Sequence, residues 1–151
     1  MPPGRGPKFG DSIRRAACNQ PPRHAGRASE LERTLARFGA TCARVVRADV
    51  LEFSEGGFDR VLLDPPCSGL GVLAGRPDAR WRRTPEDADE LAGLQRAMLE
   101  HALGLLEPGG ALVYSVCTLR RDECEGVLPG GGYLLPQTEG SDGFYIARTG
   151  A

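Results

Sequence analysis

The chain has 151 residues, of which 40% are hydrophobic and 26% charged, a composition typical of a globular domain with its own core. No apolar run approaches the roughly 20 residues of a membrane-spanning helix, so no membrane partner is expected. The net charge is −1, yet residues 1–27 carry six Lys/Arg against one acid, Asp11. The five cysteines lack the spacing of a disulfide framework, which indicates free thiols in a reducing compartment.

Residues 1–27 are rich in Pro, Gly and Arg without hydrophobic periodicity, and they are predicted to be a disordered basic arm. The alternative of a mitochondrial transit peptide is opposed by the Pro and Gly content, which disfavours an amphipathic helix. The folded domain is expected to be residues 28–151. It begins with a helix that Ser29 caps and Gly39 ends. The predicted apolar face of this helix consists of Leu31, Leu35 and Phe38.

A long second helix is predicted from the run that begins "RTPEDADEL". Thr84 can cap it, Pro85 suits its first position, and acidic residues fill its first turn. The sequence Pro108-Gly109-Gly110 should stop it. The predicted buried stripe consists of Leu91, Leu94, Met98, Ala102 and Leu105.

Apolar runs at residues 42–50, 58–64, 111–116 and 143–148 are predicted to be strands. The segment "RRDECEGVL" could form a short helix. Alternation of strands and helices with short turns is typical of an α/β fold with a parallel sheet. Ligands of such sheets bind beyond the carboxyl ends of the strands.

Three chemically useful residues, Asp49, Asp64 and Cys117, fall at predicted carboxyl ends. A thiolate such as that of Cys117 can add to carbon 6 of a pyrimidine ring, which makes carbon 5 nucleophilic toward a methyl sulfonium. Asp64 could hold the nitrogen edge of the ring, and Cys67 could assist release of the product. The alternatives are ordinary ones, because a cysteine after a strand is usually a core residue and an aspartate there often a turn residue.

Two other chemistries use residues of these types. Amino-group methyltransferases use an Asp/Asn-Pro-Pro-aromatic turn, but Cys67 occupies the fourth position here and cannot stack on a base. A thiol or zinc site could be built from Cys67, Cys117, Cys124 and His101, but their spacing does not match a zinc knuckle. No metal is therefore expected.

Three strings, in order, resemble the RsmB/Nop2/Sun family of RNA cytosine-5 methyltransferases, most closely its bacterial 16S rRNA members. "DPPCSG" matches the Asp-Ala/Pro-Pro-Cys-Ser-Gly turn of that family, and "YSVCTL" matches its Tyr-Ser-Thr/Val-Cys-Thr signature. "YLLPQTEGSDGFYIAR" resembles its C-terminal strand. The resemblance implies a Rossmann-like class I fold that uses S-adenosylmethionine, with a parallel sheet and an antiparallel C-terminal strand.

The resemblance also implies roles for single residues. Cys117 would be the nucleophile at carbon 6, Cys67 would assist release of the methylated RNA, and Asp64 would lie between base and methyl donor. Asp49 would contact the adenosine part of S-adenosylmethionine. The basic loop "RPDARWRR" (76–83), with Trp81, could contact RNA phosphates and stack on bases, or be a solvated loop with a packing Trp.

The sequence departs from the family in lacking its Gly-rich strand–turn, so the central first strand of the sheet and the N-terminal RNA-binding domain are expected to be missing. The domain is accordingly predicted to be an incomplete methyltransferase domain, and the chain a truncated one. The alternative function is a catalytically silent remnant or an RNA-binding module. RNA, most naturally rRNA, is the expected partner, and the chain is expected to be monomeric. Its expected location is the cytoplasm for a bacterial protein, or mitochondria or nucleoli for a eukaryotic one.

Overall fold

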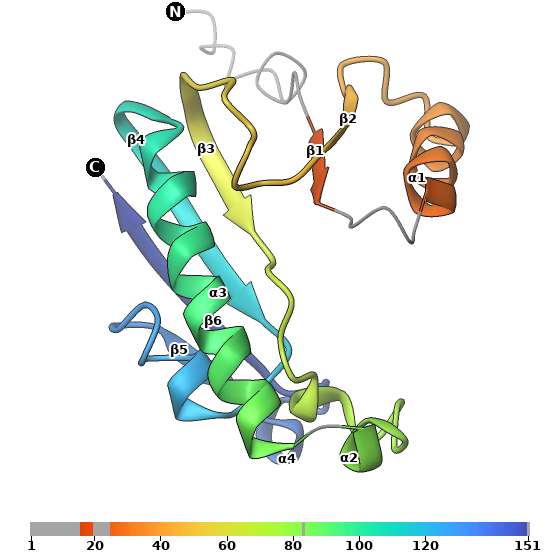
Figure 1. Cartoon of the computed structure of the whole chain (residues 1–151). Coiled ribbons are helices and arrows are strands. Elements are labelled where there is room, and N and C mark those ends of the chain that lie inside the picture. Colours follow the sequence, from red (N-terminus) through yellow and green to blue (C-terminus); the bar gives the residue numbers. More distant parts are fainter. Residues whose placement is uncertain (1–15, 20–24, 83, 151) are drawn as a thin grey trace, which may run out of the picture. The chain divides into compact units, whose positions relative to one another are not determined.

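The structure, a computed structural model, describes residues 16–19, 25–82 and 84–150 (Figure 1). The chain divides into two compact units, Met1–Phe53 and Ser54–Ala151. Within the described ranges, no helix is long and apolar enough to cross a membrane.

The first unit consists of two parallel strands, β1 (Ala16–Asn19) and β2 (Val45–Ala48), and the helix α1 (Ala25–Arg37) that connects them in sequence. Strand β1 and the start of α1 fall within the arm predicted to be disordered, whose residues 1–15 and 20–24 lie outside the described structure. The predicted cap was wrong. The helix begins at Ala25, and the Ser29 hydroxyl accepts a hydrogen bond from Arg47 Nη2 at 2.8 Å.

The end of α1 follows the prediction only in part. Gly39 has φ of 65°, a left-handed conformation that glycine adopts without strain, and the chain turns there as expected. Phe38, however, is 75% exposed, because it lies beyond the last helical residue. The apolar face of the helix therefore does not extend to Phe38.

The second unit contains a four-stranded sheet in the order β3-β4-β6-β5 (Figure 1). Its strands are β3 (Phe58–Leu63), β4 (Leu106–Val116), β5 (Gly132–Leu134) and β6 (Phe144–Gly150). Strands β3 and β4 are parallel, and β6 runs antiparallel to β4, which confirms the predicted α/β sheet with an antiparallel C-terminal strand. Within the sheet as described, β3 is an edge strand.

Helix α3 (Pro85–Gly104) lies along one face of this sheet (Figure 1). Its predicted start is confirmed. The Thr84 side chain accepts from the Asp87 backbone N–H at 3.2 Å, and the Asp87 carboxylate accepts from the Thr84 N–H at 2.9 Å, which forms a reciprocal capping box. The helix stops at Gly104, four residues before Pro108, because Leu106–Val116 already forms strand β4.

The buried stripe of α3 differs from the predicted one at a position that matters for the site. Met98 and Ala102 are buried as expected, but Leu94 is 38% exposed and the polar Gln95 is fully buried in its place. The stripe consists of Ala88, Ala92, Gln95, Met98, Leu99 and Ala102.

The core of the second unit lies between α3 and the facing side of the sheet. The alternating residues Leu112, Tyr114 and Val116 of β4 are fully buried there. On the opposite face Leu62 of β3, which pairs with Val113, is 71% exposed. One face of the sheet thus carries the core, and the other presents apolar side chains to solvent.

Short elements fill the connections. They are the 3-10 turn η2 (Leu70–Val72), α2 (Ala79–Arg82), the 3-10 turn η3 (Arg121–Glu123) and α4 (Pro136–Glu139). The turn η3 occupies the segment that was predicted as a short helix. It packs near α3, which brings Glu123 beneath the ends of the strands.

Candidate active site

The candidate site lies where β3 and β4 end. Asp64 directly follows Leu63, the last residue of β3, and Cys117 directly follows Val116, the last residue of β4. Because these strands are parallel neighbours, both residues emerge at the same edge of the sheet. The prediction that strand ends would carry these residues is confirmed, and it holds for Asp49 after β2 as well.

The two prolines after Asp64 steer the chain from β3 toward the end of β4. Proline fixes φ and provides no N–H, so Pro65 and Pro66 cannot continue the sheet. The carbonyl of Pro66 instead accepts a hydrogen bond from Gln95 Nε2 of α3 at 2.8 Å. This path brings Cys67 Sγ to 3.4 Å from Cys117 Sγ, so the two thiols meet.

Backbone hydrogen bonds join three segments around the thiols. Gly71 N–H donates to the carbonyl of Cys117 at 3.0 Å, and Gly143 N–H donates to the carbonyl of Gly71 at 2.8 Å. A Cβ atom on Gly71 would lie only 2.1 Å from the Gly143 carbonyl oxygen. Only glycine therefore permits this close approach.

A buried polar network, which the sequence did not reveal, lies beneath the thiols. Its members Ser68, Gln95, Thr118 and Glu123 are all buried. Glu123 Oε2 accepts from the Ser68 backbone N–H at 2.8 Å and from Gln95 Nε2 at 3.0 Å. The only sign of this network in the sequence is Glu123 itself, a glutamate six residues after Cys117 and close to the end of β4.

The network also connects the hydroxyl groups of the two cysteine segments. Ser68 Oγ lies 2.8 Å from Thr118 Oγ1, and Thr118 Oγ1 makes a longer hydrogen bond of 3.4 Å to Glu123 Oε1. The Tyr114 hydroxyl lies 2.8 Å from the Glu123 carbonyl and 3.1 Å from Gln95 Oε1, so it can donate to either. Burial raises the pKa of Tyr114, which keeps this hydroxyl protonated.

The cysteines of this unit differ in electrostatic environment. A hydrogen bond from Cys67 lowers the pKa of Cys117 to about 7, although burial and the charge of Asp64 oppose the shift. The same hydrogen bond, together with burial, raises the pKa of Cys67. Burial raises the pKa of Cys124 to about 11, and its thiol donates to the Thr118 carbonyl at 3.6 Å. Within the pair of Cys67 and Cys117, the Cys117 thiol therefore ionises easily and the Cys67 thiol holds its proton.

Asp64 is exposed at the surface, but partial desolvation by its surroundings raises its pKa. Its charge acts on Cys117, so the carboxyl and the thiol belong to one electrostatic site. Asp49 belongs to the first unit. It is exposed, and its Oδ1 accepts from the Leu51 N–H at 3.0 Å in a local turn. The structure thus brings Asp64, Cys67 and Cys117 together and describes Asp49 by itself.

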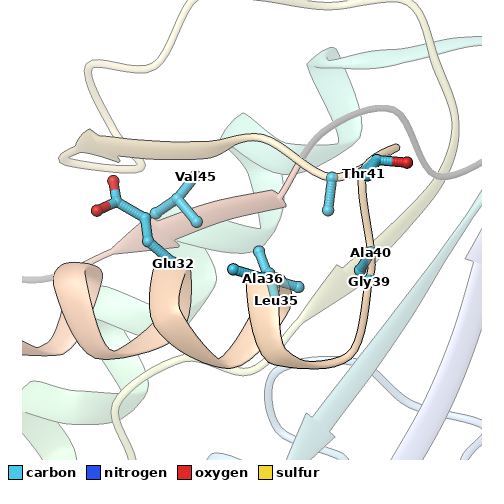
Figure 2. A pocket seen from close by; sticks show the side chains of 8 residues that line it. Glu32, Leu35, Ala36, Gly39, Ala40, Thr41 and Val45 are labelled. Carbon is cyan, nitrogen blue, oxygen red and sulfur yellow. The ribbon is translucent and has the colours of Figure 1, made fainter.

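A hollow of about 300 Å³ in the first unit lies between the end of α1 and the start of β2 (Figure 2). Leu35 and Val45 face it, and Glu32 is its one ionisable lining residue (Figure 2). None of its lining residues is a predicted site residue. Across the described residues, no group of three or more His, Cys, Asp or Glu is placed to hold a metal ion, and this includes the candidate set around Cys67, Cys117, Cys124 and His101.

The chemistry of the carboxylates fits the cofactor that the resemblance implies. Asp49 and Asp64 are both exposed beyond strand ends. Carboxylates accept hydrogen bonds, and S-adenosylmethionine offers an ammonium group, an adenine amine and ribose hydroxyls as donors. Each of these carboxylates, taken by itself, has the chemistry to accept a hydrogen bond from one of those groups.

Comparison with known proteins gives a consistent set of similarities. The family model for "16S rRNA methyltransferase RsmB/F" matches residues 17–130. Ribosomal RNA small subunit methyltransferase F of Escherichia coli is 33% identical over 156 aligned positions, which cover 82% of this chain and 33% of that protein. Ribosomal RNA small subunit methyltransferase B of Shewanella oneidensis is 37% identical over 113 positions, covering 60% of this chain and 26% of that protein.

Similarity extends to solved structures. NSun6 from Pyrococcus horikoshii, whose crystal structure was solved with SFG, matches with a TM-score of 0.76 and 29% identity. The match covers 89% of this chain and 40% of that one. The chain thus spans about a third or less of the curated relatives named above.

Proposed function

Because the chain belongs to the RsmB/F family of 16S rRNA methyltransferases, whose fold is that of class I S-adenosylmethionine-dependent methyltransferases, we propose that it methylates carbon 5 of a cytosine in RNA. The observation that carries the proposal is the pair of thiols 3.4 Å apart at the carboxyl end of the sheet. Ribosomal RNA is the proposed substrate because the matched family and the curated relatives act on it.

Cys117 acts as the nucleophile in this proposal. Its pKa of about 7 leaves a large share of the thiol ionised near neutral pH, and the thiolate is the reactive form. Addition to carbon 6 breaks the double bond of the ring and gives carbon 5 the electron density to accept a methyl group. The raised pKa of Asp64 suits a carboxyl that shares a proton with the nitrogen edge of the ring.

Cys67 acts as the partner acid. Its thiol keeps its proton in the free protein, and it hydrogen-bonds to the nucleophile. After methylation a base takes the proton of carbon 5, the double bond between carbons 5 and 6 re-forms, and Cys117 leaves carbon 6 as a thiolate. Cys67, which still carries its proton, assists this elimination by donating its hydrogen bond to the departing sulfur. S-adenosylmethionine, for which Asp49 and Asp64 are the proposed contacts, supplies the methyl group.

The segment around Trp81, which was expected to be a loop but contains the short helix α2, supports an RNA substrate. Trp81 is 83% exposed, so it does not pack against the protein, and Arg76 and Arg80 are exposed beside it in the sequence. An exposed aromatic ring next to arginines can stack on a base while their guanidinium groups contact phosphates. The same loop also favours the second candidate function, an RNA-binding module without catalysis. On either proposal we expect the chain to act as a monomer, in the cytoplasm if the protein is bacterial and in mitochondria or nucleoli if it is eukaryotic.

The experiment that tests catalysis looks for the covalent intermediate. Purified Cys67→Ala protein is incubated with small-subunit rRNA and S-adenosylmethionine, and denaturing gels are examined for an RNA–protein adduct. We expect an adduct that disappears when Cys117→Ala is added to the same chain. Replacement of the exposed Cys42 of the first unit is the matched control and should leave the adduct intact.

Calorimetric titration with S-adenosylhomocysteine separates the two candidate functions. Binding of the cofactor product together with adduct formation supports the methyltransferase. RNA binding without either result identifies the RNA-binding module instead.

A further inference from the structure

Glu123 is a buried carboxylate that bonds to the residue after each site cysteine. Its side chain is 0% exposed. Oε2 accepts from the Ser68 backbone N–H at 2.8 Å, and Oε1 accepts from the Thr118 hydroxyl at 3.4 Å. Ser68 follows Cys67 and Thr118 follows Cys117, so one carboxylate holds both cysteine segments.

The two cysteine segments also contact each other directly through a hydrogen bond. Ser68 Oγ and Thr118 Oγ1 lie 2.8 Å apart, and Gln95 Nε2 of α3 donates both to Glu123 Oε2 at 3.0 Å and to the Pro66 carbonyl at 2.8 Å. Helix, turn η3 and both cysteine segments therefore share one hydrogen-bonded network. This buried network therefore fixes the positions of the residues next to the thiols.

Stability alone is a poor reason for this arrangement. A buried carboxylate loses its hydration, and a well-packed apolar group of similar volume is often as stabilising or more so. In the described part of the chain, no Lys or Arg forms a salt bridge with Glu123. Neutral donors satisfy it, and they come from the segments that carry the thiols.

We propose that Glu123 is a positioning residue, which sets the distance and relative orientation of Cys67 and Cys117 through Ser68 and Thr118. The consequence for chemistry rests on the function proposed above. If Cys67 assists the departure of Cys117 from carbon 6, the spacing of the two sulfur atoms controls the rate of release.

The spacing can be measured without RNA or cofactor. Diamide oxidises two adjacent thiols to a disulfide, and the rate of linking Cys67 to Cys117 reports how often their sulfur atoms meet. We expect Glu123→Ala to slow this reaction by about a hundredfold, the size of effect that small misplacement of reacting groups produces. Peptide mass spectrometry identifies the linked pair.

The conservative variant should rescue the spacing. In Glu123→Gln the amide oxygen can still accept from the Ser68 N–H and from Gln95, and the new NH₂ group can donate to the Thr118 hydroxyl. Its cross-linking rate should stay within about threefold of the wild type, because each hydrogen bond is exchanged rather than left unmade. Asp122→Ala, next to Glu123 but in an exposed ion pair with Arg120, is the matched control and should not change the rate.

A folding defect is separated from mispositioning by a second variant and a second measurement. Thr118→Val keeps the shape of the side chain and removes the hydroxyl from the network, so it should slow cross-linking by about tenfold. Urea unfolding of each variant identifies those that are folded under the assay conditions. If Thr118→Val and a folded Glu123→Ala cross-link as fast as the wild type, the positioning role is refuted.

The kinetics of RNA methylation then separate this inference from the proposed function. If the wild-type chain methylates RNA, the Glu123→Ala variant should have a lower kcat, and this decrease should be larger than any increase in KM. If the wild type forms no methylated RNA but cross-linking follows the predicted order, Glu123 still positions the thiols and only the proposed function fails. If methylation proceeds normally in Glu123→Ala, the positioning role is wrong while the proposed function stands.

Discussion

Replacement of Cys67 by alanine should raise the pKa of Cys117. The largest cause of the low pKa of Cys117 is its hydrogen bond with Cys67, whose sulfur lies 3.4 Å away. In the variant, burial and the negative charge of Asp64 remain, and both raise the pKa. The variant thiol should therefore ionise near or above the ordinary value.

The magnitude follows from the shift itself. The pKa of Cys117 is lowered from 9.0 to about 7, so about half of the thiol is ionised at pH 7 in the wild type. With the pKa restored, about 1% is ionised, which is a loss of about fiftyfold in thiolate. A thiolate of higher pKa is also more nucleophilic, by about eightfold over this shift, so the alkylation rate at pH 7 falls by only about sixfold.

The midpoint of the pH profile is therefore a better observable than a single rate. Iodoacetamide modification of the peptide that carries Cys117 is followed by mass spectrometry between pH 5 and pH 10. The midpoint should move upward by about two pH units in Cys67→Ala. Cys67→Ser, whose hydroxyl can still donate, should move less. An unchanged midpoint in the alanine variant would refute the hydrogen bond as the cause.

Three further predictions concern single residues around the site. Asp64→Asn should lower the pKa of Cys117 further, because the carboxylate charge raises it, and should nevertheless slow RNA adduct formation; an unchanged or higher midpoint of the alkylation pH profile would contradict the charge argument. Gly71→Ala should destabilise the fold by about 1–3 kcal/mol in urea unfolding, since its Cβ would lie 2.1 Å from the Gly143 carbonyl oxygen, and a neutral result would show that these segments separate easily. Trp81→Ala should leave the unfolding midpoint unchanged and weaken RNA binding by about 1–3 kcal/mol in filter-binding assays, whereas equal affinity would remove the loop from the RNA surface.

The features that could be predicted are those encoded locally. Thr84, Pro85 and the following acids signal a helix start through backbone hydrogen bonding within one turn, and the structure has that start. Apolar runs that end at Asp64 and Cys117 signal buried strands, and parallel pairing then places both residues at one edge. Local chemistry and one general rule of α/β sheets were sufficient for this part.

The features that were missed depend on contacts between distant segments. Hydropathy favoured Leu94 for the buried stripe of α3, but Gln95 is buried because the Pro66 carbonyl and Glu123 lie opposite it. Nothing near Glu123 in the sequence indicates that its partners are Ser68, fifty-five residues earlier, and Thr118. The start of α1 at Ala25 was missed for a different reason, since a preceding Pro- and Gly-rich segment masks the periodicity.

Two backbone hydrogen bonds, from Gly71 to Cys117 and from Gly143 to Gly71, have a consequence for how binding energy is used. Both bonds join backbone groups, so they do not depend on the rotamer of any side chain. Ordering a loop costs conformational entropy, and here that cost is met during folding rather than during encounter with a substrate. An incoming nucleotide would meet thiols that are already in place, and its contacts with the protein would be free to act on the ring rather than on the loops around it.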